Sequence, residues 1–597
     1  MTTTQRTTRL HRYGRQRSTT LRASSAFLIP ALLLAACGGS TTPAASSTAQ
    51  EPPPIAGLVS APGGPFLTDT SGRRLQFHGV NMVAKCESTS IASTAAGSPC
   101  LPGPAGAAAS EPNYYLALDT SEADPERRIT ESEVETLAAM GFTSARVGII
   151  WAGLEPGPLG VEPNDPRYCT AHANGTAFAA LAPADEPFDQ AAIDAYLANI
   201  DGLVAMLARH GIRSLIDMHQ DDYSAAFYNA TGTTPWKAEG APLWAVCTGA
   251  ASSGAALPPS SAAAWGTAPY TDSRITTAIG HFWANDVSAN LQGEYIRTFA
   301  AVATHYQGNA AVLGYDLFNE PFNNTLDEVV APLLNSELQC IYAGKTYAPL
   351  SCGLTLPPQQ SPDSGLIPAL QAADPGHLEF FEPDAAANLG DPNTIAVLES
   401  LPFTNLVYGF HVYPQPAGNT VLEQLILSEE QLSRGLMQTK QSGGPAWFMT
   451  EFGAANDVGD DANYGKLADS MFLSWMYWAA KEFHDPTGGA EEGLLDANGV
   501  PQPMAAVLTR TYPLATAGTP IAQTFDPDSA AFSFSYTPDI TVTAPTQIFV
   551  PVAQHYPKGY QVSVSGATVT SAAGAAVLTL QNEAGATKVE VSVSAVQ

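Results

Sequence analysis

The sequence predicts a (β/α)8 barrel followed by a C-terminal antiparallel β-sandwich. Three observations support this prediction: short apolar runs alternate with helical patterns, polar side chains follow almost every apolar run, and the last part of the chain changes to period-two alternation. A chain of 597 residues is also too long for one compact core. We expect an export signal at 1–37, a linker at 38–60, the barrel at 61–513 and the sandwich at 514–597.

Eight apolar runs have the length and composition of buried strands. They lie at residues 75–83, 144–151, 212–219, 312–319, 377–382, 406–411, 446–451 and 473–478. Helical patterns at 130–140, 188–210 and 292–306 separate some of these runs. The first pattern opens with Thr130 and has Glu133 three residues later, which is the spacing of a capping box.

Catalytic residues of such a barrel lie at the C-terminal ends of its strands. Nearly every predicted strand ends at or near a titratable or amide side chain, whereas random placement would leave most ends apolar. These residues are Lys85, Arg146, His219, Asn319, Glu320, Glu382, His411 and Glu451. Three long insertions, at 84–128, 220–290 and 321–362, follow strands and should stand over the same end of the barrel. The aromatic residues of the middle insertion predict either an ordered wall or simply its own core.

Two of the strand ends deliver a glutamate, Glu320 before Pro321 and Glu451 before Phe452. Pro321 cannot donate to a strand ladder and so ends its strand. Two carboxylates that flank a glycosidic bond are the minimum equipment for hydrolysing it. We expect Glu320 to be a general acid with a raised pKa and Glu451 to be an ionised nucleophile. A separation of about 5–5.5 Å would give retention and about 6.5–9.5 Å inversion, and the sequence leaves that open.

These motifs resemble glycoside hydrolase family 5, and more narrowly its endoglycoceramidase-like members. The matching segments are 79–85, 146–156, 217–224, 318–321, 411–413 and 450–453, and residues 512–520 resemble the family's passage into a C-terminal sandwich. The resemblance implies a retaining mechanism with Glu320 as acid/base and Glu451 as nucleophile. It also implies sugar-binding roles, which fall on Lys85, His219, Asp221, Asn319 and Tyr413. Trp478, or else Trp475, matches the aromatic platform under the sugar.

Several site residues have a second interpretation. Trp244 is a candidate for further sugar stacking, but it lies in a long insertion. Arg146 and His411 belong to the predicted binding set, although Arg146 is equally explained as a support that keeps a carboxylate ionised. His219 could be a buried structural histidine. Glu382 is better explained as a partner of the catalytic residues than as a third catalytic acid.

The N-terminus predicts export. Six arginines and no acid precede an apolar run at 26–36, which is too short to span a bilayer, and Cys37 follows Leu-Ala-Ala. This segment resembles a bacterial lipoprotein box with Cys37 as the lipidated residue; the alternative is an ordinary signal peptide. Residues 38–56 are rich in Ser, Thr, Ala and Pro and resemble a flexible tether.

Charge and cysteine content limit the partners. The net charge is −30, and removal of the six arginines leaves about −36, which argues against nucleic acid and against a basic patch on anionic lipid. Apart from Cys37, six cysteines remain, and chain order suggests the pairs Cys86–Cys100, Cys169–Cys247 and Cys340–Cys352. Metal binding is the rival explanation, but no two cysteines have CxxC spacing. We expect no metal and no organic cofactor.

The predicted function is a retaining endo-glycosidase that hydrolyses the β-glycosidic bond between an oligosaccharide and ceramide in glycosphingolipids. Alternatives are a β-glucosidase of sterol glucosides or another glycolipid, an endoglucanase or mannanase, and a non-catalytic lipoprotein that binds glycan or lipid. The expected partners are the glycolipid and a membrane reached through the lipid anchor. We expect a monomer that is exported, either as a cell-envelope lipoprotein or to the extracellular medium.

Overall fold

The computed structural model describes residues 57–84, 87–88, 115–118, 120, 125–158, 161–173, 176–228, 236–237, 240–249, 272–322, 331–356, 360–389, 403–414, 418–437, 443–454, 457–483 and 492–597. All of them belong to one compact unit, Gln50–Gln597. Some predicted features lie outside the described residues: the export signal with Cys37, most of the linker, Lys85, and the Cys86–Cys100 pair.

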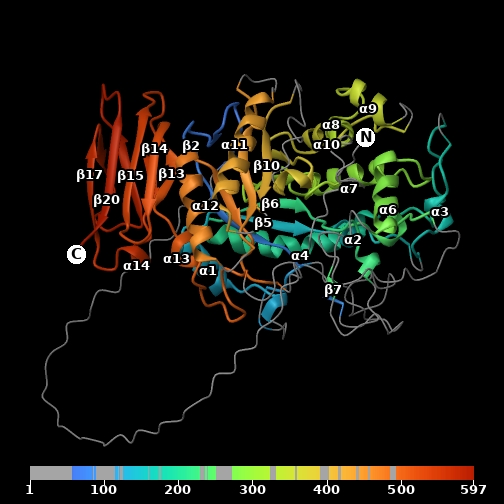
Figure 1. The fold of residues 1–597 in the computed structure, drawn as a ribbon, viewed down its shortest axis with the longest axis horizontal. Helices are drawn as coiled ribbons and strands as arrows, with labels where there is room; N and C mark the ends of the chain where they lie inside the picture. The colour runs from blue at the N-terminus through green and yellow to red at the C-terminus, as the bar shows by residue number, and fades with distance from the viewer. Residues whose placement is uncertain are drawn as a thin grey trace, which may run out of the picture. The chain divides into compact units, whose positions relative to one another are not determined.

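Eight parallel strands close into a barrel, as the sequence predicts (Figure 1). They are β3 (His78–Met82), β5 (Ser144–Ile149), β6 (Arg213–Met218), β8 (Val312–Asp316), β9 (Leu378–Phe381), β10 (Leu406–Val412), β11 (Ala446–Phe452) and β12 (Ser474–Tyr477). The order around the barrel is β10-β11-β12-β3-β5-β6-β8-β9, so chain order is kept throughout. Each strand lies within or at the edge of one of the eight predicted runs.

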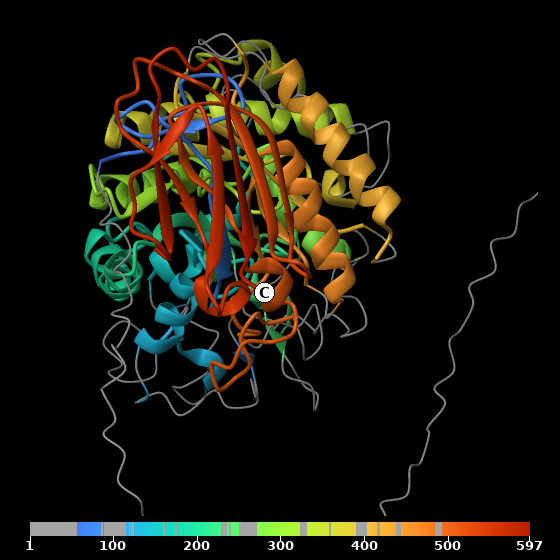
Figure 2. The ribbon, with the colours of Figure 1, turned by 90° about the vertical axis from the view of Figure 1, so that its left-hand side faces the viewer.

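Helices surround the barrel (Figures 1 and 2). They are α1 (Glu131–Ala139), α2 (Trp151–Leu154), α3 (Pro166–Cys169), α4 (Gln190–Arg209), α6 (Ser273–Ala284), α7 (Leu291–His305), α8 (Ala331–Ala343), α9 (Pro349–Thr355), α10 (Leu366–Ala373), α11 (Thr420–Leu436) and α12 (Val458–Met471). Short 3-10 segments are η1 (Pro125–Arg127), η2 (Ala225–Tyr228), η3 (Leu243–Ala245) and η5 (Ala385–Leu389). The three predicted helices correspond to α1, α4 and α7, and the capping box of Thr130 and Glu133 is present.

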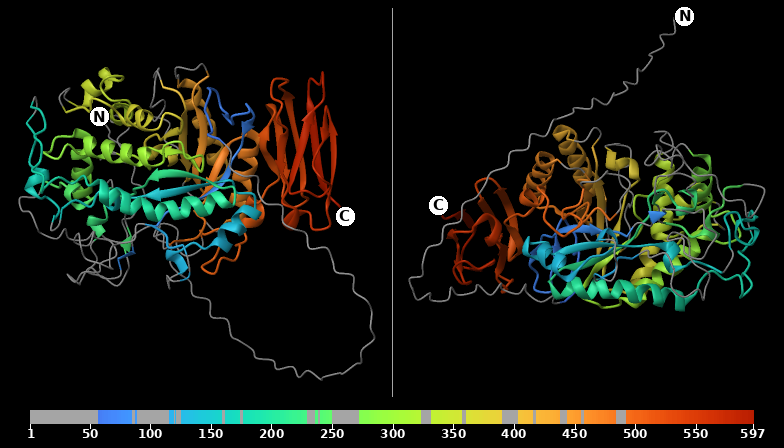
Figure 3. Two further views of the ribbon diagram at one scale, coloured as in Figure 1. Left: turned by 180° about the vertical axis from the view of Figure 1, so that it is seen from behind. Right: turned by 90° about the horizontal axis from the view of Figure 1, so that it is seen from below.

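Helix α4 is the one helix among the described residues whose length and composition would suffice to cross a membrane. Its mean hydropathy has a different explanation here. Eight of its side chains are buried, among them Ile193, Leu197 and Leu207, and it packs on β6 and α7 along the flank of the barrel (Figure 3). We therefore interpret α4 as a core helix of the barrel.

The inside of the barrel is filled at its N-terminal end by aliphatic and aromatic side chains from the strands, including Leu313, Phe380 and Phe448. Residues 59–77 precede the first barrel strand and pack Val59 and Phe77 against this layer. The N-terminal half of the barrel is thus a closed apolar core, and the polar side chains lie at the C-terminal ends of the strands.

A β-sandwich follows the barrel, with two antiparallel sheets. One sheet contains β14 (Gly518–Asp526), β15 (Ala531–Pro538), β20 (Val589–Ala595) and β17 (Tyr560–Ser565); the other contains β13 (Tyr512–Thr516), β16 (Thr546–Phe549), β19 (Val577–Asn582) and β18 (Ala567–Val569). The second sheet also includes β1 (Leu67–Thr68) and β2 (Arg74–Leu75), which precede the barrel, because β2 pairs with β13. Two short helices, α13 (Ala505–Leu508) and α14 (Val552–His555), and a ribbon of β4 (Glu87–Ser88) with β7 (Trp236–Lys237) complete the described elements.

The sandwich contacts the end of the barrel opposite to the catalytic strand ends (Figures 1 and 3). Tyr512 stacks on His78, the first residue of β3, with 3.6 Å between ring centroids, and its hydroxyl donates to the carbonyl of Gly141. Nearby, Arg510 forms a buried ion pair with Asp469 of α12 at 2.5 Å. These contacts give the sandwich a supporting position, away from the catalytic face.

Two of the three predicted disulfides are confirmed. Cys169 is bonded to Cys247 and Cys340 to Cys352. The first ties the segment after β5 to the insertion after β6, and the second closes the end of α8 onto α9. Both therefore fix loops that rise from the C-terminal ends of barrel strands.

Candidate active site

A guanidinium at the centre of the barrel mouth organises the site. Arg146 of β5 is fully buried, and its five N–H groups face four carboxylates, one from each of four other strands or strand ends. The N···O distances are 2.9 Å to Asp217, 2.8 Å to Asp316, 3.1 Å to Glu382 and 2.5 Å to Glu451. Burial alone would lower the pKa of Arg146, but these carboxylates raise it well above its usual value. Arg146 is therefore a permanent cation.

Arg146 does not bind substrate in this arrangement. Its side chain has no exposed surface, and two of its nitrogens also donate to the amide oxygens of Asn319 and Asn81, at 2.7 and 3.4 Å. The structure therefore favours the second interpretation of Arg146, that it supports the carboxylates, over the predicted contact with substrate. Asn81 was not singled out in the sequence, although it lies on the first barrel strand.

Glu451 lies inside β11 with only 5% of its side chain exposed. Arg146 donates to its Oε1, and the hydroxyl of Tyr413 donates to its Oε2 at 3.0 Å. Burial raises the pKa of Glu451 to about 7, against the positive charges of His411 and Arg146, which lower it. The sequence predicts an ionised Glu451. Because of this raised pKa, the ionised fraction of Glu451 changes with pH around neutrality.

Glu320 is held differently. It follows the end of β8 with a φ of +42°, in the left-handed region that a glutamate rarely adopts, and 26% of its side chain is exposed. Its Oε1 accepts from Nδ2 of Asn388 at 3.0 Å and from Nδ1 of His411 at 2.8 Å. Its backbone N–H donates to Glu382 at 2.9 Å. An amide, an imidazole and, through the backbone, a carboxylate therefore position Glu320, whereas a guanidinium and a phenol hold Glu451.

His411 links the two glutamates. A register shift between Phe410 and His411 makes His411 the strand partner of Glu451, and its Nδ1 lies 2.8 Å from Glu320 and 3.5 Å from Glu451. Burial lowers the pKa of His411, but the charges of Glu382 and Glu451 and the hydrogen bond to Glu320 raise it well above its usual value. The imidazole is fully buried and is therefore not a substrate contact. It orients the two glutamates and places a positive charge beside them.

Glu382 balances this imidazolium, as the sequence suggests. Its Oε1 lies 3.2 Å from Nε2 of His411. Burial raises the pKa of Glu382, but the charge and hydrogen bond of His411 and the charge of Arg146 lower it to about 2. Glu382 is thus ionised and buried, unable to exchange a proton with substrate at neutral pH.

The two candidate catalytic carboxylates face each other across a short gap. One oxygen of Glu320 and one of Glu451 lie within 4.8 Å of each other. This gap is close to the separation of about 5–5.5 Å in retaining glycosidases, and too short for the water that inverting enzymes place between their carboxylates. The geometry thus agrees with double displacement.

On the other side of the mouth, His219 follows β6 and its ring lies nearly parallel to that of Trp478, 5.5 Å between centroids. Nδ1 of His219 is 2.7 Å from Asp217, and Nε2 points toward Asp221 at 3.6 Å. The side chain of Asp221 is 16% exposed, and Trp478 as a whole residue is 5% exposed. This wall offers an imidazole edge, a carboxylate and an indole face, which suit a sugar ring.

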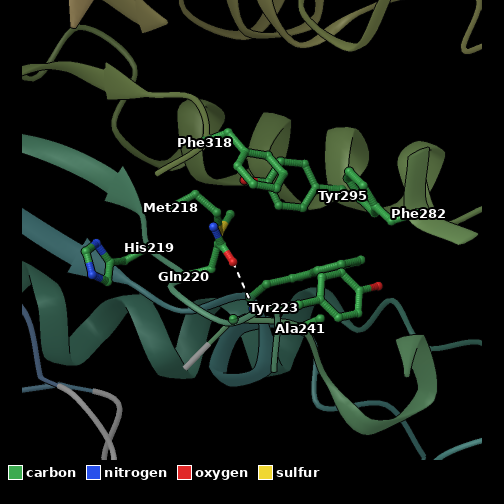
Figure 4. A pocket seen from close by; sticks show the side chains of 10 residues that line it. Met218, His219, Gln220, Tyr223, Ala241, Phe282, Tyr295 and Phe318 are labelled. Carbon is green, nitrogen blue, oxygen red and sulfur yellow. Dashed lines mark hydrogen bonds between the residues drawn. The ribbon is translucent and has the colours of Figure 1, made fainter. Parts of the chain in front are cut away.

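Gln220 is a site residue that the motif contained but that was not singled out. Its Nε2 donates to the carbonyls of Asn319 and Glu320 at 2.8 and 3.0 Å, and its own carbonyl accepts from Nδ2 of Asn319 at 2.7 Å. Its Oε1 accepts from the N–H of Tyr223 (Figure 4). A small apolar cavity of about 20 Å³ lies behind it, lined by Phe282, Tyr295, Phe318 and neighbouring residues; His219 points away from this cavity (Figure 4). Gln220 therefore clamps the backbone of Glu320 from behind.

Trp244 is not at the site. It is fully buried in η3, packs edge-on against Trp151 with 5.4 Å between centroids, and donates its indole N–H to the carbonyl of Glu155. The structure thus supports the core interpretation of this aromatic residue and not sugar stacking. Trp475 is buried as well, against His78, which leaves Trp478 as the platform candidate.

Among the described residues, Glu320, His411 and Glu451 are the group whose ligand atoms converge closely enough to hold a metal ion. Nδ1 of His411, however, faces Glu320 at hydrogen-bond distance and carries a proton. A metal ion would have to displace this proton, so the donor set is better matched to proton sharing between the two glutamates.

Comparison with known proteins finds relatives over most of the barrel and the sandwich. The family profile described as Cellulase (glycosyl hydrolase family 5) matches residues 117–484, and Glycoside hydrolase family 5 C-terminal domain matches residues 510–594. Endoglycoceramidase I of Rhodococcus hoagii (strain 103S) is 28% identical over 68% of this chain and 74% of its own, and Endoglycoceramidase of Cyanea nozakii is 26% identical over 62% and 71%. The structure of endo-glycoceramidase II from Rhodococcus sp. in its ganglioside GM3 complex aligns with a TM-score of 0.60 and 22% identity over 89% of this chain and all of that one.

Proposed function

The chain belongs to glycoside hydrolase family 5, and from this premise we propose that it hydrolyses the β-glycosidic bond between an oligosaccharide and ceramide in glycosphingolipids. The observation that carries the substrate assignment is the similarity to two proteins named endoglycoceramidase over more than three-fifths of the chain. The observation that supports the retaining mechanism is the gap of at most 4.8 Å between Glu320 and Glu451.

In the first step, a carboxylate oxygen of Glu451 attacks the anomeric carbon as the bond from that carbon to the ceramide oxygen breaks. Glu320 donates its proton to the departing oxygen, so ceramide leaves as a neutral alcohol. Arg146 and Tyr413 hold the two oxygens of Glu451, which restricts the attacking group to one orientation. The glycan is then linked as an ester to Glu451.

In the second step, Glu320 is an anion and takes a proton from water, whose oxygen attacks the anomeric carbon and displaces Glu451. The configuration is inverted twice and therefore retained. Nδ1 of His411 donates to Glu320 and stabilises its anionic state between the steps. The glycan leaves intact, with a free reducing end.

We further propose that the sugar next to the cleaved bond lies between His219, Asp221 and Trp478, with Lys85 completing the site. Asn319 contributes a single donor. Its Oδ1 accepts from Arg146 and one N–H of Nδ2 donates to Gln220, so one N–H remains for an acceptor such as the 2-hydroxyl oxygen.

The proposed location is the cell envelope or the exterior. The basic N-terminus, the short apolar run and Cys37 support an exported lipoprotein, and the two disulfides fit an oxidising compartment. A glycolipid substrate in a membrane and an anchor at Cys37 would place enzyme and substrate at the same surface. We propose a monomer in which the sandwich supports the barrel.

The test uses the full chain with Cys37→Ser, which removes the proposed acylation site. It is incubated with a ganglioside and, separately, with a glucosylceramide and a sterol glucoside, and the products are identified by mass spectrometry. Intact oligosaccharide plus free ceramide, absent with Glu451→Gln, is the expected result. Cleavage of the sterol glucoside alone would replace the proposed substrate by a sterol glycoside. Release from none of the three lipids would contradict the proposal.

A further inference from the structure

Helix α11 presents an apolar stripe to solvent. Val421, Leu425, Leu432 and Leu436 are 77, 50, 55 and 51% exposed, which makes α11 the richest helix in exposed large aliphatic side chains among the described residues. At 100° per residue these four positions fall within about 60° of one another on the helix. They form a single line along the outer face of α11, which lies on the outside of the barrel (Figures 1 and 2).

Three of the four charged residues of α11 point away from this face, and the fourth, Glu429, is half-buried beside the line of the stripe. The carboxylates of Glu423 and Glu430 are buried; Asn463 donates to Glu423, and Tyr408 donates to Glu430 at 2.6 Å. Arg434 donates to the carbonyls of Gly443 and Pro445 at the base of the helix. The most exposed residues of α11 are all uncharged: Thr420, Val421, Gln424, Leu425, Ser428, Gln431, Leu432, Gly435 and Leu436. A surface helix normally shows the reverse pattern, with charges outside.

The stripe is too small to hold two copies of the chain together. A helix of 17 residues is about 25 Å long and about 10–12 Å wide, so one face offers about 300 Å² and two faces about 600 Å². Stable protein complexes bury about 1,200–2,000 Å². The stripe also lacks the aromatic residues and arginine that dominate protein interfaces. A lipid surface needs neither a matching partner nor these residues.

Charge identifies the kind of lipid. The chain carries a net charge of −30 and the exposed face of α11 contains no basic residue, so an anionic bilayer would repel the protein and gain no counter-charge. A neutral or zwitterionic surface has no such penalty. The position fits as well, since α11 begins at Thr420, seven positions after Tyr413 in the sequence, and its most exposed residue, Val421, lies at the catalytic end.

We propose that the stripe Val421–Leu425–Leu432–Leu436 is a docking surface for neutral lipid, and that it holds the flank of the barrel against a zwitterionic membrane with the catalytic mouth at the edge of the contact. The apolar side chains enter the boundary between headgroups and acyl chains, while the helix axis stays in the plane of the surface. Binding depends on this helix and on no glycolipid, so it stands or falls separately from the proposed substrate.

The test is flotation with phosphatidylcholine vesicles that contain no glycolipid. The full chain with Cys37→Ser is compared with the same chain that also carries Val421→Gln, Leu425→Gln, Leu432→Gln and Leu436→Gln. Glutamine keeps the helix propensity and removes the apolar surface. The matched control carries Leu350→Gln and Ile540→Gln, two other exposed aliphatic residues that are each 83% exposed but isolated.

We expect the stripe variant to bind at least about tenfold more weakly, and the control to bind as the parent does. Raising NaCl from about 0.15 to about 1 M should leave binding of the parent unchanged, because no ion pair is involved. Hydrolysis of a soluble aryl β-glycoside should be equal in all three chains, which shows that the stripe variant is folded.

Three results would overturn the proposal. One is equal binding of the parent and the stripe variant. Another is binding that requires phosphatidylglycerol and disappears in salt, which would indicate an electrostatic contact elsewhere. The third is a parent that is dimeric in solution by light scattering, with a monomeric stripe variant, which would make the stripe an interface between two copies.

Discussion

Glu451 and Glu320 are the same side chain in two surroundings. Glu451 lies within a strand, is almost fully buried, and has a permanent cation at one oxygen and a phenol at the other. Glu320 follows a strand in a left-handed conformation, is about one-quarter exposed, and is held by an amide and an imidazole. The first surroundings hold the carboxylate in one orientation inside the protein, whereas the second leave the carboxyl group partly open to solvent.

This difference explains how one barrel mouth supplies both a nucleophile and an acid/base. A nucleophile must keep one orientation and one charge at the moment of attack, and Arg146 holds the orientation and favours the charge. An acid/base must exchange a proton twice in each cycle, and its partial exposure leaves the Glu320 carboxyl within reach of the departing oxygen and of water. Role therefore follows from surroundings rather than from residue type.

The largest expected effect separates the two glutamates directly. Glu451→Gln should lower kcat by at least about 10⁴-fold on every substrate, because no group remains to form the covalent intermediate. Glu320→Gln should be as inactive on a glycolipid but should retain its first step on a dinitrophenyl β-glycoside, whose leaving group needs no proton. Burst kinetics with both substrates check this. Equal loss in both variants on the activated substrate would remove the assignment of separate roles.

We expect the second largest effect for Arg146→Met. Four buried carboxylates would lose their cation, so we expect a loss of unfolding free energy of about 3–5 kcal/mol and a fall in kcat of at least about 100-fold in the protein that still folds. The matched variant is Arg510→Met, which breaks a comparable buried pair with Asp469 beside the sandwich. It should lower the melting temperature similarly and leave kcat unchanged. A similar kcat loss in both would mean that Arg146 acts through stability alone.

The pH dependence tests the surroundings of Glu451. Burial raises its pKa to about 7, and the reaction needs its ionised form, so kcat/KM should fall as the pH drops below about 7. Tyr413→Phe removes a hydrogen bond that favours the ionised form and should move this acid limb to higher pH, with kcat about 10–100-fold lower.

Tyr408→Phe is the control for that shift, because Tyr408 of β10 makes the same kind of contact with Glu430 of α11, outside the barrel mouth. Its pH profile should match that of the parent. An acid limb that stays in place in Tyr413→Phe would show that another group titrates.

The clamp on Glu320 should give effects no larger than the loss of the Tyr413 hydroxyl. Gln220→Ala and Asn388→Ala each remove hydrogen bonds that hold Glu320, and each should lower kcat by about 10–100-fold with little change in KM. Gln371→Ala is the control, since its amide also donates to a backbone carbonyl, that of Thr404 before β10. An effect on KM alone would indicate that Gln220 or Asn388 binds substrate instead.

The barrel was predictable because its signal is local. Each strand is a short apolar run, and the position of a polar residue at its end follows from chain order alone. For the same reason Glu320, Glu451, His219 and His411 could be expected at the same end of the barrel before any distance was known. The antiparallel sandwich was predictable from the period-two alternation of residues 532–536 and of later runs.

What could not be predicted depends on distance and burial. The register shift before His411, the left-handed backbone of Glu320 and the contact of Asn388 with Glu320 arise from tertiary packing. Trp244 carries no sequence mark that distinguishes a buried indole from a stacking platform, and the structure buries it. The pairing of β2 with β13 joins segments at opposite ends of the chain, which periodicity cannot detect.

The most direct test of the account is to trap the covalent intermediate. The enzyme is treated with a 2-deoxy-2-fluoro β-glycosyl fluoride, digested with a protease, and the labelled peptide is sequenced by mass spectrometry. We expect one glycosyl group per chain, on Glu451, and none in Glu451→Gln. A label on Glu320 or Glu382, or hydrolysis of the fluoride with inversion and no label, would contradict it.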